Sequence, residues 1–255
     1  MKAALLLLGL SLPGLALSAT ACDEKAGDYT ACIAQQYRQP VAQWPAPQVD
    51  ADVQWQEMAA LPAHAPAPPD NPFSDAKAAL GKKLFNDPKL SRSGQIACAS
   101  CHEADMAFAD GRRVSFGHDR QSGRRNAPSL VMSGYSPALF WDGRGGGLEQ
   151  QAMHPIIDPL EMAFDIPQLL QRLNADAAYR EQFAQIFGAG PITTERTGQA
   201  LATFQRTLVS ATRNTPFEQL LRGRPQRMSD EQLHGLHLFR TKARCMNCHF
   251  GPALS

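Results

Sequence analysis

The sequence predicts an all-α fold built from two related units. Apolar residues recur at helical spacing in several segments, and no segment sustains the apolar–polar alternation of a half-buried strand. A motif of the form C-x-x-C-H occurs twice, at residues 98–102 and 245–249. Each copy follows a helix-like stretch that ends in Gly-x-x-Leu-Phe, at residues 81–85 and 235–239. The repeated order of helix and motif indicates two units of one kind.

The first predicted helix lies shortly before the first motif. Ser74 can cap its N-terminus, and Leu80, Leu84 and Phe85 then fall on one face. Residues 86–88, Asn-Asp-Pro, end this helix, because proline interrupts helical hydrogen bonding.

Four more helices are predicted between the two motifs. Their inward faces consist of apolar residues at helical spacing: Leu169, Leu170 and Leu173; Tyr179, Phe183, Ile186 and Phe187; Ala200, Leu201, Phe204 and Leu208; and Leu233, Leu236 and Phe239. Gly188 closes the second of these helices, and Thr194 can cap the third. The Ser-x-x-Gln capping box at residues 229–232 opens the fourth.

The C-x-x-C-H motif is the attachment signal for a c-type haem. Two cysteines at this spacing can each form a thioether to the porphyrin, and the histidine reaches the iron on the proximal side. The sequence therefore predicts two covalently attached c-type haems. The residues that would hold them are Cys98, Cys101 and His102 for the first, and Cys245, Cys248 and His249 for the second.

The chain divides into four parts: a signal peptide at 1–21, a proline-rich N-terminal arm at 22–72, a first cytochrome c-like domain at 73–213, and the start of a second at 214–255. The arm contains Pro40, Pro45, Pro47, Pro62, Pro66, Pro68, Pro69 and Pro72, which favours extended and weakly ordered chain. Only residues 250–255 follow the second motif. We therefore expect the second domain to be incomplete, without the segment that normally supplies the second axial ligand.

The first 21 residues are typical of a secretory leader. Lys2 supplies the charged start, residues 3–17 form the apolar run, and Ala-Thr-Ala at 19–21 fits a small-x-small cleavage site. No later stretch approaches the roughly 20 apolar residues of a membrane helix. The mature protein is therefore expected to be soluble and, given covalent haem attachment, to be periplasmic.

Two cysteines lie outside the haem motifs. In an oxidising compartment Cys22 and Cys32 can form a disulfide. Cys22 also directly follows the predicted cleavage site, so it could instead be a lipidated N-terminus. The preceding Ala-Thr-Ala lacks the leucine usual in a lipid-attachment signal, which favours the disulfide.

The charge balance argues against a nucleic-acid partner. The 25 basic and 24 acidic residues give a net charge of +1, far from the strongly basic face that nucleic acid requires. A local excess lies between residues 110 and 126, with Arg112, Arg113, Arg120, Arg124 and Arg125. This loop is either a solvated surface or a site that neutralises haem propionates or docks a redox partner.

A series of motifs from residue 80 to about 250 carries a family resemblance. They are L-F-N-D-P-K-L-S at 84–91, F-A-D-G at 108–111, S-F-G-H at 115–118, R-N-A-P at 125–128, F-W-D-G-R at 140–144, L-E-Q-Q at 148–151 and P-L-E-M at 159–162. With the two haem motifs, this series resembles the bacterial di-haem cytochrome c peroxidase family, which includes a methylamine-utilisation di-haem oxidase.

The resemblance implies that the first haem reacts with peroxide and that electrons enter at the second. His118 matches the distal histidine, an iron ligand that leaves when the other haem is reduced. Glu161 matches the acid–base residue that moves a proton between the peroxide oxygens. Its apolar neighbours would raise its pKa by desolvation. Gln151 matches a second polar residue of the same pocket.

Two further roles and an assembly state follow from the resemblance. Trp141 matches the tryptophan between the haems, a plausible route for electron transfer. Asn126 matches a calcium ligand, although a calcium site needs six to eight oxygens and the family's other ligands lie beyond residue 255. The family also implies a homodimer.

The predicted function is reduction of hydrogen peroxide to water, with electrons from a small cytochrome c or copper protein. Two alternatives remain. One is a di-haem oxidase that acts on a partner protein, as the methylamine-utilisation relative does. That relative lacks the distal histidine and has a tyrosine on its second haem. The other is a non-catalytic electron carrier whose two haems both stay six-coordinate.

Overall fold

The computed structural model describes residues 22–210 and 214–254. The predicted signal peptide, 1–21, lies outside these residues. Within them the chain is helical and has no β-strand, only isolated bridges such as Glu103 with Ala109. The all-α prediction is confirmed for this part of the chain. No helix in it is long and apolar enough to cross a membrane.

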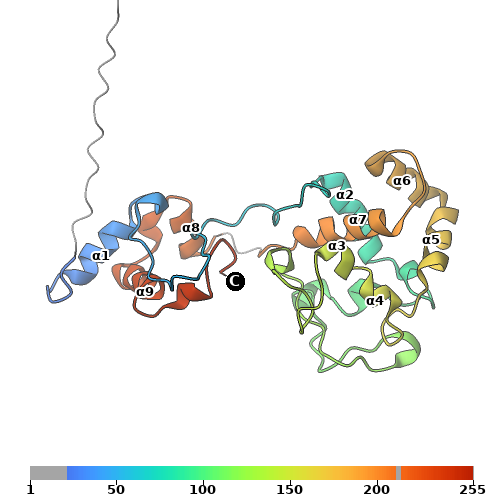
Figure 1. Cartoon of the computed structure of the whole chain (residues 1–255), viewed down its shortest axis with the longest axis horizontal. Helices are drawn as coiled ribbons and strands as arrows, with labels where there is room; N and C mark the ends of the chain where they lie inside the picture. The colour runs from blue at the N-terminus through green and yellow to red at the C-terminus, as the bar shows by residue number, and fades with distance from the viewer. Residues whose placement is uncertain (1–21, 211–213, 255) are drawn as a thin grey trace, which may run out of the picture.

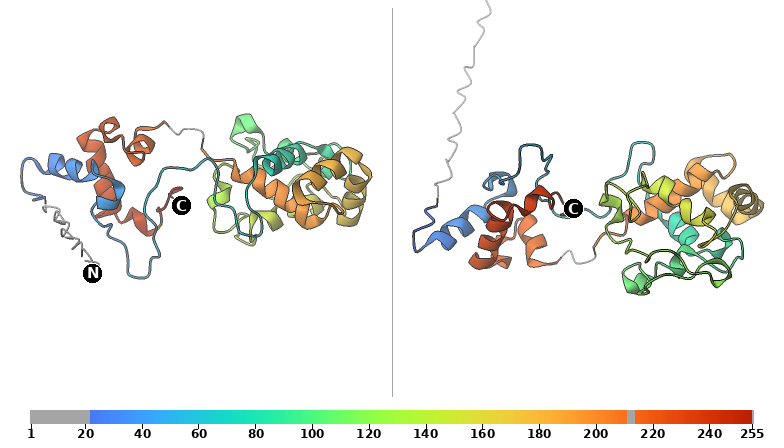
Figure 2. Two further views of the ribbon diagram at one scale, coloured as in Figure 1. Left: turned by 90° about the horizontal axis from the view of Figure 1, so that it is seen from above. Right: turned by 60° about the horizontal axis from the view of Figure 1, so that its bottom comes forward.

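Figure 1 shows the helices in two groups joined by extended chain, and both views in Figure 2 keep these groups apart. The first group contains α2 (Asp75–Phe85), α3 (Leu148–Gln151), α4 (His154–Ile157), α5 (Ile166–Ala175), α6 (Ala177–Phe187) and α7 (Thr194–Arg206). The second contains α1 (Tyr29–Tyr37), α8 (Pro216–Leu221) and α9 (Asp230–Arg240). We call them the first and second bodies.

The first body is organised around the crossing of α2 and α7. Ser74 caps α2 as predicted, accepting a hydrogen bond from the Lys77 N–H. At the crossing, a Cβ on Gly81 would overlap the Ala200 carbonyl, so the two helix backbones meet directly. Phe85 and Phe204 pack next to this contact, with ring centroids 5.1 Å apart.

The predicted helices α5, α6 and α7 are confirmed, with one shift at a cap. The side chain of Thr193, and not that of Thr194, accepts the hydrogen bond from the Arg196 N–H at the start of α7. Thr194 is the first residue inside the helix. Threonine side chains can cap from either position, and local sequence does not distinguish the two.

The segment 22–72, predicted as an arm, contains structure of its own. Helix α1 packs against α9, and the extended chain after it runs along the second body. Together they form an apolar core of Ile33, Ala34, Tyr37, Trp44, Met58, Leu220, Leu233, Leu236 and Met246. The prolines do lie in extended chain, but aromatic and aliphatic residues between them attach it to α9.

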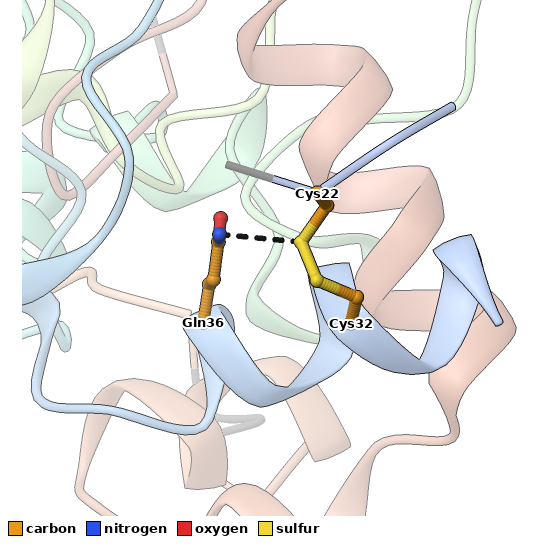
Figure 3. Close-up of a disulfide and its surroundings, with 3 residues drawn as sticks. All are labelled: Cys22, Cys32 and Gln36. Atoms are coloured by element: carbon orange, nitrogen blue, oxygen red, sulfur yellow. Dashed lines mark hydrogen bonds between the residues drawn. A yellow bond between two sulfur atoms is a disulfide. The ribbon is translucent and has the colours of Figure 1, made fainter. Parts of the chain in front are cut away.

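Cys22 and Cys32 form a disulfide at the start of this segment. Figure 3 shows the bond closing the chain onto α1, with the Gln36 amide 3.3 Å from the Cys22 sulfur. A sulfur held in this bond is not free for a lipid thioether, which supports the disulfide over the lipid anchor.

Helix α9 leads directly into the second motif. The Ser229 hydroxyl accepts from the Gln232 N–H, and the Gln232 side chain accepts from the Ser229 N–H, which confirms the capping box. Gly235 occupies the place that Gly81 has in the first body. Among the described residues nothing lies within 4 Å of a Cβ added there.

Candidate haem sites

The first C-x-x-C-H motif begins in a short helical turn, η3 (Cys98–Ser100). The Ser100 hydroxyl accepts a hydrogen bond from the Ala97 N–H at 3.1 Å. Just upstream, the Ser91 hydroxyl accepts from the Ile96 N–H at 3.1 Å. The backbone of this motif is therefore shaped by contacts within a few residues of it.

The imidazole of His102 is oriented by the loop that follows it. Its Nδ1 donates to the Phe108 carbonyl at 2.8 Å, so Nε2 carries the lone pair that an iron would need. Ala107 and Phe108 both have positive φ, so this loop turns sharply back onto the histidine. Burial lowers the pKa of His102, which favours the neutral imidazole that binds iron.

A cavity of about 410 Å³ opens beside this histidine. Its wall includes His102 of the motif, Phe108 of the loop after it, Phe85 of α2 and Phe204 of α7. A c-type haem requires an imidazole, two nearby thiols and an apolar lining. The first motif supplies the imidazole and the thiols, and Phe85, Phe108 and Phe204 supply the apolar lining, so these residues fit the group.

Glu161 lies within electrostatic reach of the same motif. Burial raises the pKa of the Cys98 thiol to about 12, with a smaller contribution from the charge of Glu161. Burial also raises the pKa of Cys101, and Glu161 again adds to the increase. Glu161 is 60 or more positions further along the chain, so the fold brings it to the first haem motif.

His118 and Glu161 are joined through the backbone. The His118 N–H donates to the Glu161 carbonyl at 2.7 Å, and a Cβ on Gly117 would overlap the Leu160 and Glu161 carbonyls. The Nδ1 of His118 is buried and has no hydrogen-bond partner among the described residues. Its Nε2 lies 3.5 Å from an Asp119 carboxylate oxygen. An imidazole with an unpaired buried nitrogen fits an exchangeable iron ligand.

A tight turn presents Glu161. The Asp158 carboxylate accepts from the Leu160 N–H at 2.8 Å, and its carbonyl accepts from the Glu161 N–H at 3.1 Å. Burial raises the pKa of Glu161, the charge of Asp158 raises it further, and Arg144 opposes both. Glu161 is nevertheless exposed at the surface, which leaves a route for protons and small molecules.

Trp141 and Asn126 lie together on the surface of the first body. The Trp141 indole N–H donates to the Asn126 carbonyl at 3.0 Å, and the Trp141 side chain is 63% exposed. The Asn126 amide donates to the Arg112 carbonyl at 2.6 Å. No group of three or more His, Cys, Asp or Glu residues in the described ranges is arranged to hold a metal ion.

Gln151 is the last residue of α3 and is half-buried. Its neighbour Glu149 forms a bidentate ion pair with Arg206 of α7, with distances of 2.6 and 3.2 Å. A Cβ on Gly198 would overlap the Glu149 carbonyl, so α3 is tightly fixed against α7. The position of Gln151 is thus set by α3, but no described contact joins it to Glu161 or His118.

The second motif repeats the orientation of the histidine. The Nδ1 of His249 donates to the Leu254 carbonyl at 2.8 Å, which again leaves Nε2 free. Arg244 and Leu254 have positive φ on either side of the motif. Its cysteines form no disulfide, and neither do those of the first motif. The second set of donors therefore also fits a c-type haem.

Sequence reasoning missed a residue that contacts the second motif. The Asp50 carboxylate accepts from the Asn247 amide at 2.5 Å, and the Asp50 N–H donates to the Asn247 side-chain oxygen at 3.0 Å. The two residues are 197 positions apart. No local pattern in the sequence connects them.

Comparisons with known proteins identify the family. A profile of the di-haem cytochrome c peroxidases matches residues 75–226. The chain is 43% identical over 190 residues to a methylamine utilization protein, MauG, from Methylophilus methylotrophus, covering 74% of this chain and 56% of that protein. It is 40% identical over 178 residues to a cytochrome c551 peroxidase from Nitrosomonas europaea, covering 69% and 52%.

Solved structures agree with this placement. A MauG-like protein associated with microbial copper homeostasis aligns with a TM-score of 0.61 and 33% identity, over 79% of this chain and 58% of that one. The diheme peroxidase BthA from Burkholderia thailandensis aligns with a TM-score of 0.54 and 26% identity, over 80% and 57%. The chain spans about half the length of the curated relatives it matches. It belongs to the di-haem cytochrome c peroxidase family.

Proposed function

We propose that this protein reduces hydrogen peroxide to water at the first haem motif. Two electrons and two protons are consumed for each peroxide. The electrons come from a small cytochrome c or copper protein and enter at the second motif. Three observations support this function: the membership of a peroxidase family, the backbone contact between His118 and Glu161, and the influence of the Glu161 charge on Cys98 and Cys101 of the first motif.

In this proposal both haems are attached covalently, through Cys98 and Cys101 and through Cys245 and Cys248. His102 and His249 are the proximal ligands, each oriented by a backbone carbonyl on its Nδ1. A bound haem supplies the iron at which the O–O bond is broken. The residues of the chain bind the group, orient it and move the protons.

Glu161 is the proposed acid–base group. Its raised pKa keeps the carboxyl protonated to higher pH than an exposed glutamate, so it can donate a proton to a departing oxygen and take one back from solvent. Gln151 is proposed as a second polar residue of the pocket that positions peroxide or water.

His118 is proposed as a ligand that leaves before peroxide binds. Its loop begins at Gly117. The two residues that follow His118, namely Asp119 and Arg120, both have positive φ. Two consecutive residues of this short loop thus adopt a left-handed backbone conformation, which is uncommon for residues other than glycine. This strain favours a loop with a second arrangement, in which the imidazole is withdrawn.

The remaining assignments also rest on family membership. Trp141 is proposed as the electron route between the two haems, and Asn126 as one ligand of a calcium ion. We further propose that the protein is periplasmic and a homodimer, and that residues 73–213 and 214–255 belong to its two cytochrome c-like domains.

The convergence of Glu161 on the first motif carries the proposal, and a glutamine substitution tests it. In the haem-loaded chain, Glu161→Gln should slow peroxide-dependent oxidation of a reduced cytochrome c by about 10²–10⁴-fold, the usual contribution of a positioned acid–base group. Glu181→Gln, at an exposed position on α6, is the matched control. Turnover of Glu161→Gln at the control rate would exclude the acid–base role.

The 43% identity to a MauG protein favours one second candidate, an oxidase that acts on a partner protein. The presence of His118 argues against this oxidase, because the family resemblance implies that the methylamine-utilisation relative lacks the distal histidine. A non-catalytic carrier is the remaining alternative. It predicts two low-spin irons in every redox state, so a high-spin signal upon half-reduction would eliminate it.

A further inference from the structure

His118 lies near the tip of a short hairpin whose base is formed by Ser115 and Gly123. At the base, the Gly123 N–H donates to the Ser115 carbonyl at 2.9 Å, and an isolated antiparallel bridge lies next to this bond. Closer to the tip, the Gly117 N–H donates to the Gln121 carbonyl at 2.9 Å. We call this segment the His118 hairpin. Because these bonds tie its two arms together, a shift at the base moves the imidazole.

Asp110 holds the base of the His118 hairpin. One of its carboxylate oxygens accepts from the Ser115 hydroxyl at 2.7 Å, and the other accepts from the Arg112 N–H at 3.0 Å. Asp110 is only 8% exposed. Burial by itself would raise the pKa of Asp110, but these two hydrogen bonds outweigh it, so the pKa is lowered and the carboxylate is ionised at neutral pH. The Ser115 bond is therefore charge-assisted.

Asp110 also directly follows the loop that orients His102. The Phe108 carbonyl accepts from the His102 imidazole at 2.8 Å, and the Ala109 carbonyl accepts from the Glu103 N–H at 2.8 Å. The backbone that leads into Asp110 is thus fixed to the first motif by two contacts. A continuous set of hydrogen bonds connects the proximal histidine with the base of the hairpin.

The base of the hairpin lies against the first motif itself. Burial raises the pKa of the Cys101 thiol, and a hydrogen bond with the Ser115 side chain opposes that rise. Gly111 follows Asp110 with a φ of 65°, and a Cβ there would overlap the Met106 side chain. Glycine allows this tight turn. The turn brings the hairpin base next to a haem cysteine.

The tip of the hairpin is held through the backbone. The His118 N–H donates to the Glu161 carbonyl at 2.7 Å, whereas the His118 Nδ1 is buried without a partner among the described residues. A change in the side chains at the base can therefore shift the imidazole and leave every atom of His118 and Glu161 in place.

We propose that Asp110 is a positioning residue for His118, and that through Ser115 it holds the His118 hairpin where the imidazole reaches the iron of the first haem. The inference rests on the proposed role of His118 as an exchangeable iron ligand. Asp110 supplies no ligand and acts only through the hairpin. His102 and His118, the two ligands of one iron, then share one hydrogen-bonded support. Loss of the Asp110–Ser115 bond favours the released state of His118.

The spin state of the first haem tests this inference, because a second bound imidazole makes a ferric haem low-spin and its release makes the haem high-spin. The haem-loaded, fully oxidised chain is prepared as wild type and with Ser115→Ala, Asp110→Ala, both changes, or Ser115→Thr. Electron paramagnetic resonance measures the ratio of high-spin to low-spin iron, and His118→Ala identifies the high-spin signal of the first haem. Asp105→Asn, at an exposed position outside these contacts, is the matched control.

Ser115→Ala should raise the ratio of high-spin to low-spin iron at the first haem at least about tenfold, the factor expected for loss of a hydrogen bond to a charged group. Asp110→Ala should raise it by at least as much. The double variant should match Asp110→Ala, because Ser115 acts through Asp110. Ser115→Thr keeps the hydroxyl and should remain near wild type, as should Asp105→Asn.

The affinity of the oxidised chain for cyanide gives a second readout that requires no turnover. Cyanide binds ferric iron only where the sixth position is free, so it competes with His118. In Ser115→Ala the dissociation constant of cyanide at the first haem should fall by the factor by which the released state becomes more populated. Protection of α2 and α7 from hydrogen exchange should stay at the wild-type level, because the first body remains folded.

A wild-type spin state in both Ser115→Ala and Asp110→Ala, with His118→Ala high-spin, would overturn the inference and leave the peroxidase proposal intact. A high-spin Ser115→Thr would also overturn it, because the hydroxyl would then not matter. Loss of α2 and α7 protection together with the spin change would assign the effect to unfolding and overturn it too. A wild-type spectrum of His118→Ala would instead remove the proposed ligand role of His118, and the inference with it.

Discussion

The two C-x-x-C-H motifs have the same histidine geometry but different supports. In the first, Ser100 and the Phe108 loop shape the motif from within ten residues. In the second, Asp50 and Gln56 reach it from the other end of the chain. The difference shows that a short attachment signal does not specify its own surroundings. The first motif is supported within one body, whereas the second is contacted by the N-terminal segment.

The two related glycines extend this comparison. Gly81 allows the backbones of α2 and α7 to touch, whereas Gly235 on α9 faces open space in the described residues. The same sequence pattern thus has a packing partner in the first body and not in the second. Here α1 and the extended chain after it, with Trp44 and Met58, pack against α9 instead of a crossing helix.

The largest expected effect tests the buried anchor of the second body. Glu57→Ala would leave the Arg240 guanidinium buried without its carboxylate, which costs about 3–5 kcal/mol. Glu24→Ala, which removes an exposed partner of Lys242, should cost less than about 1 kcal/mol. Hydrogen exchange resolved by residue would show loss of protection in α1 and α9 and none in α2 and α7. Equal loss in both bodies would contradict their separation.

Alanine substitutions at Gly81 and Gly235 should have the next largest effects on stability, in opposite directions. Gly81→Ala should destabilise the first body by about 3 kcal/mol, because the new methyl group forces α2 and α7 apart. Gly235→Ala should stabilise α9 in this chain by about 0.5–1 kcal/mol through helix propensity. Denaturant titration of each variant measures both. A destabilising Gly235→Ala would show that this face of α9 has a partner.

Removal of the disulfide should affect only the second body. Replacing Cys22 and Cys32 by serine opens a loop whose ends are 10 positions apart, which costs about 2–3 kcal/mol. Protection of α1 and α9 from hydrogen exchange should fall, and that of α2 and α7 should not. A reduced but unsubstituted chain should behave in the same way. Unchanged protection of α1 would mean that its packing on α9 suffices.

The smallest effect is a difference in pH dependence. Burial lowers the pKa of His237, and the charge of His234 lowers it further. The stability that His237 contributes is therefore present above the ordinary histidine pKa of 6.5. This stability is lost as pH falls through the lower pKa of the folded state. Glu161, whose pKa is raised, contributes in the opposite sense and loses stability as pH rises. Between about pH 7 and 5, α9 should therefore lose protection before α7 does. His237→Gln should abolish the loss of α9 protection on acidification. If the loss persists in that variant, another group causes it.

Capping residues and apolar periodicity predicted α2, α5, α6, α7 and α9 from the sequence, because these signals act over one or two helical turns. Helix α1 was not predicted, because its short run of alanine and glutamine residues lies directly before a proline-rich stretch. The approach of Glu161 to the first motif was expected only from the family resemblance. The Asp50–Asn247 contact was not expected at all, since it joins positions 197 apart that form no motif.

Deletion of residues 22–58, with residues 1–21 retained, tests the central comparison most directly. In the shortened chain α9 should lose its protection from hydrogen exchange, because α1 and Trp44 no longer pack against it, while α2 and α7 keep theirs. Hydrogen exchange resolved by residue measures both. Unchanged protection of α9 would contradict the account, because the second body would then need no support from the N-terminal segment.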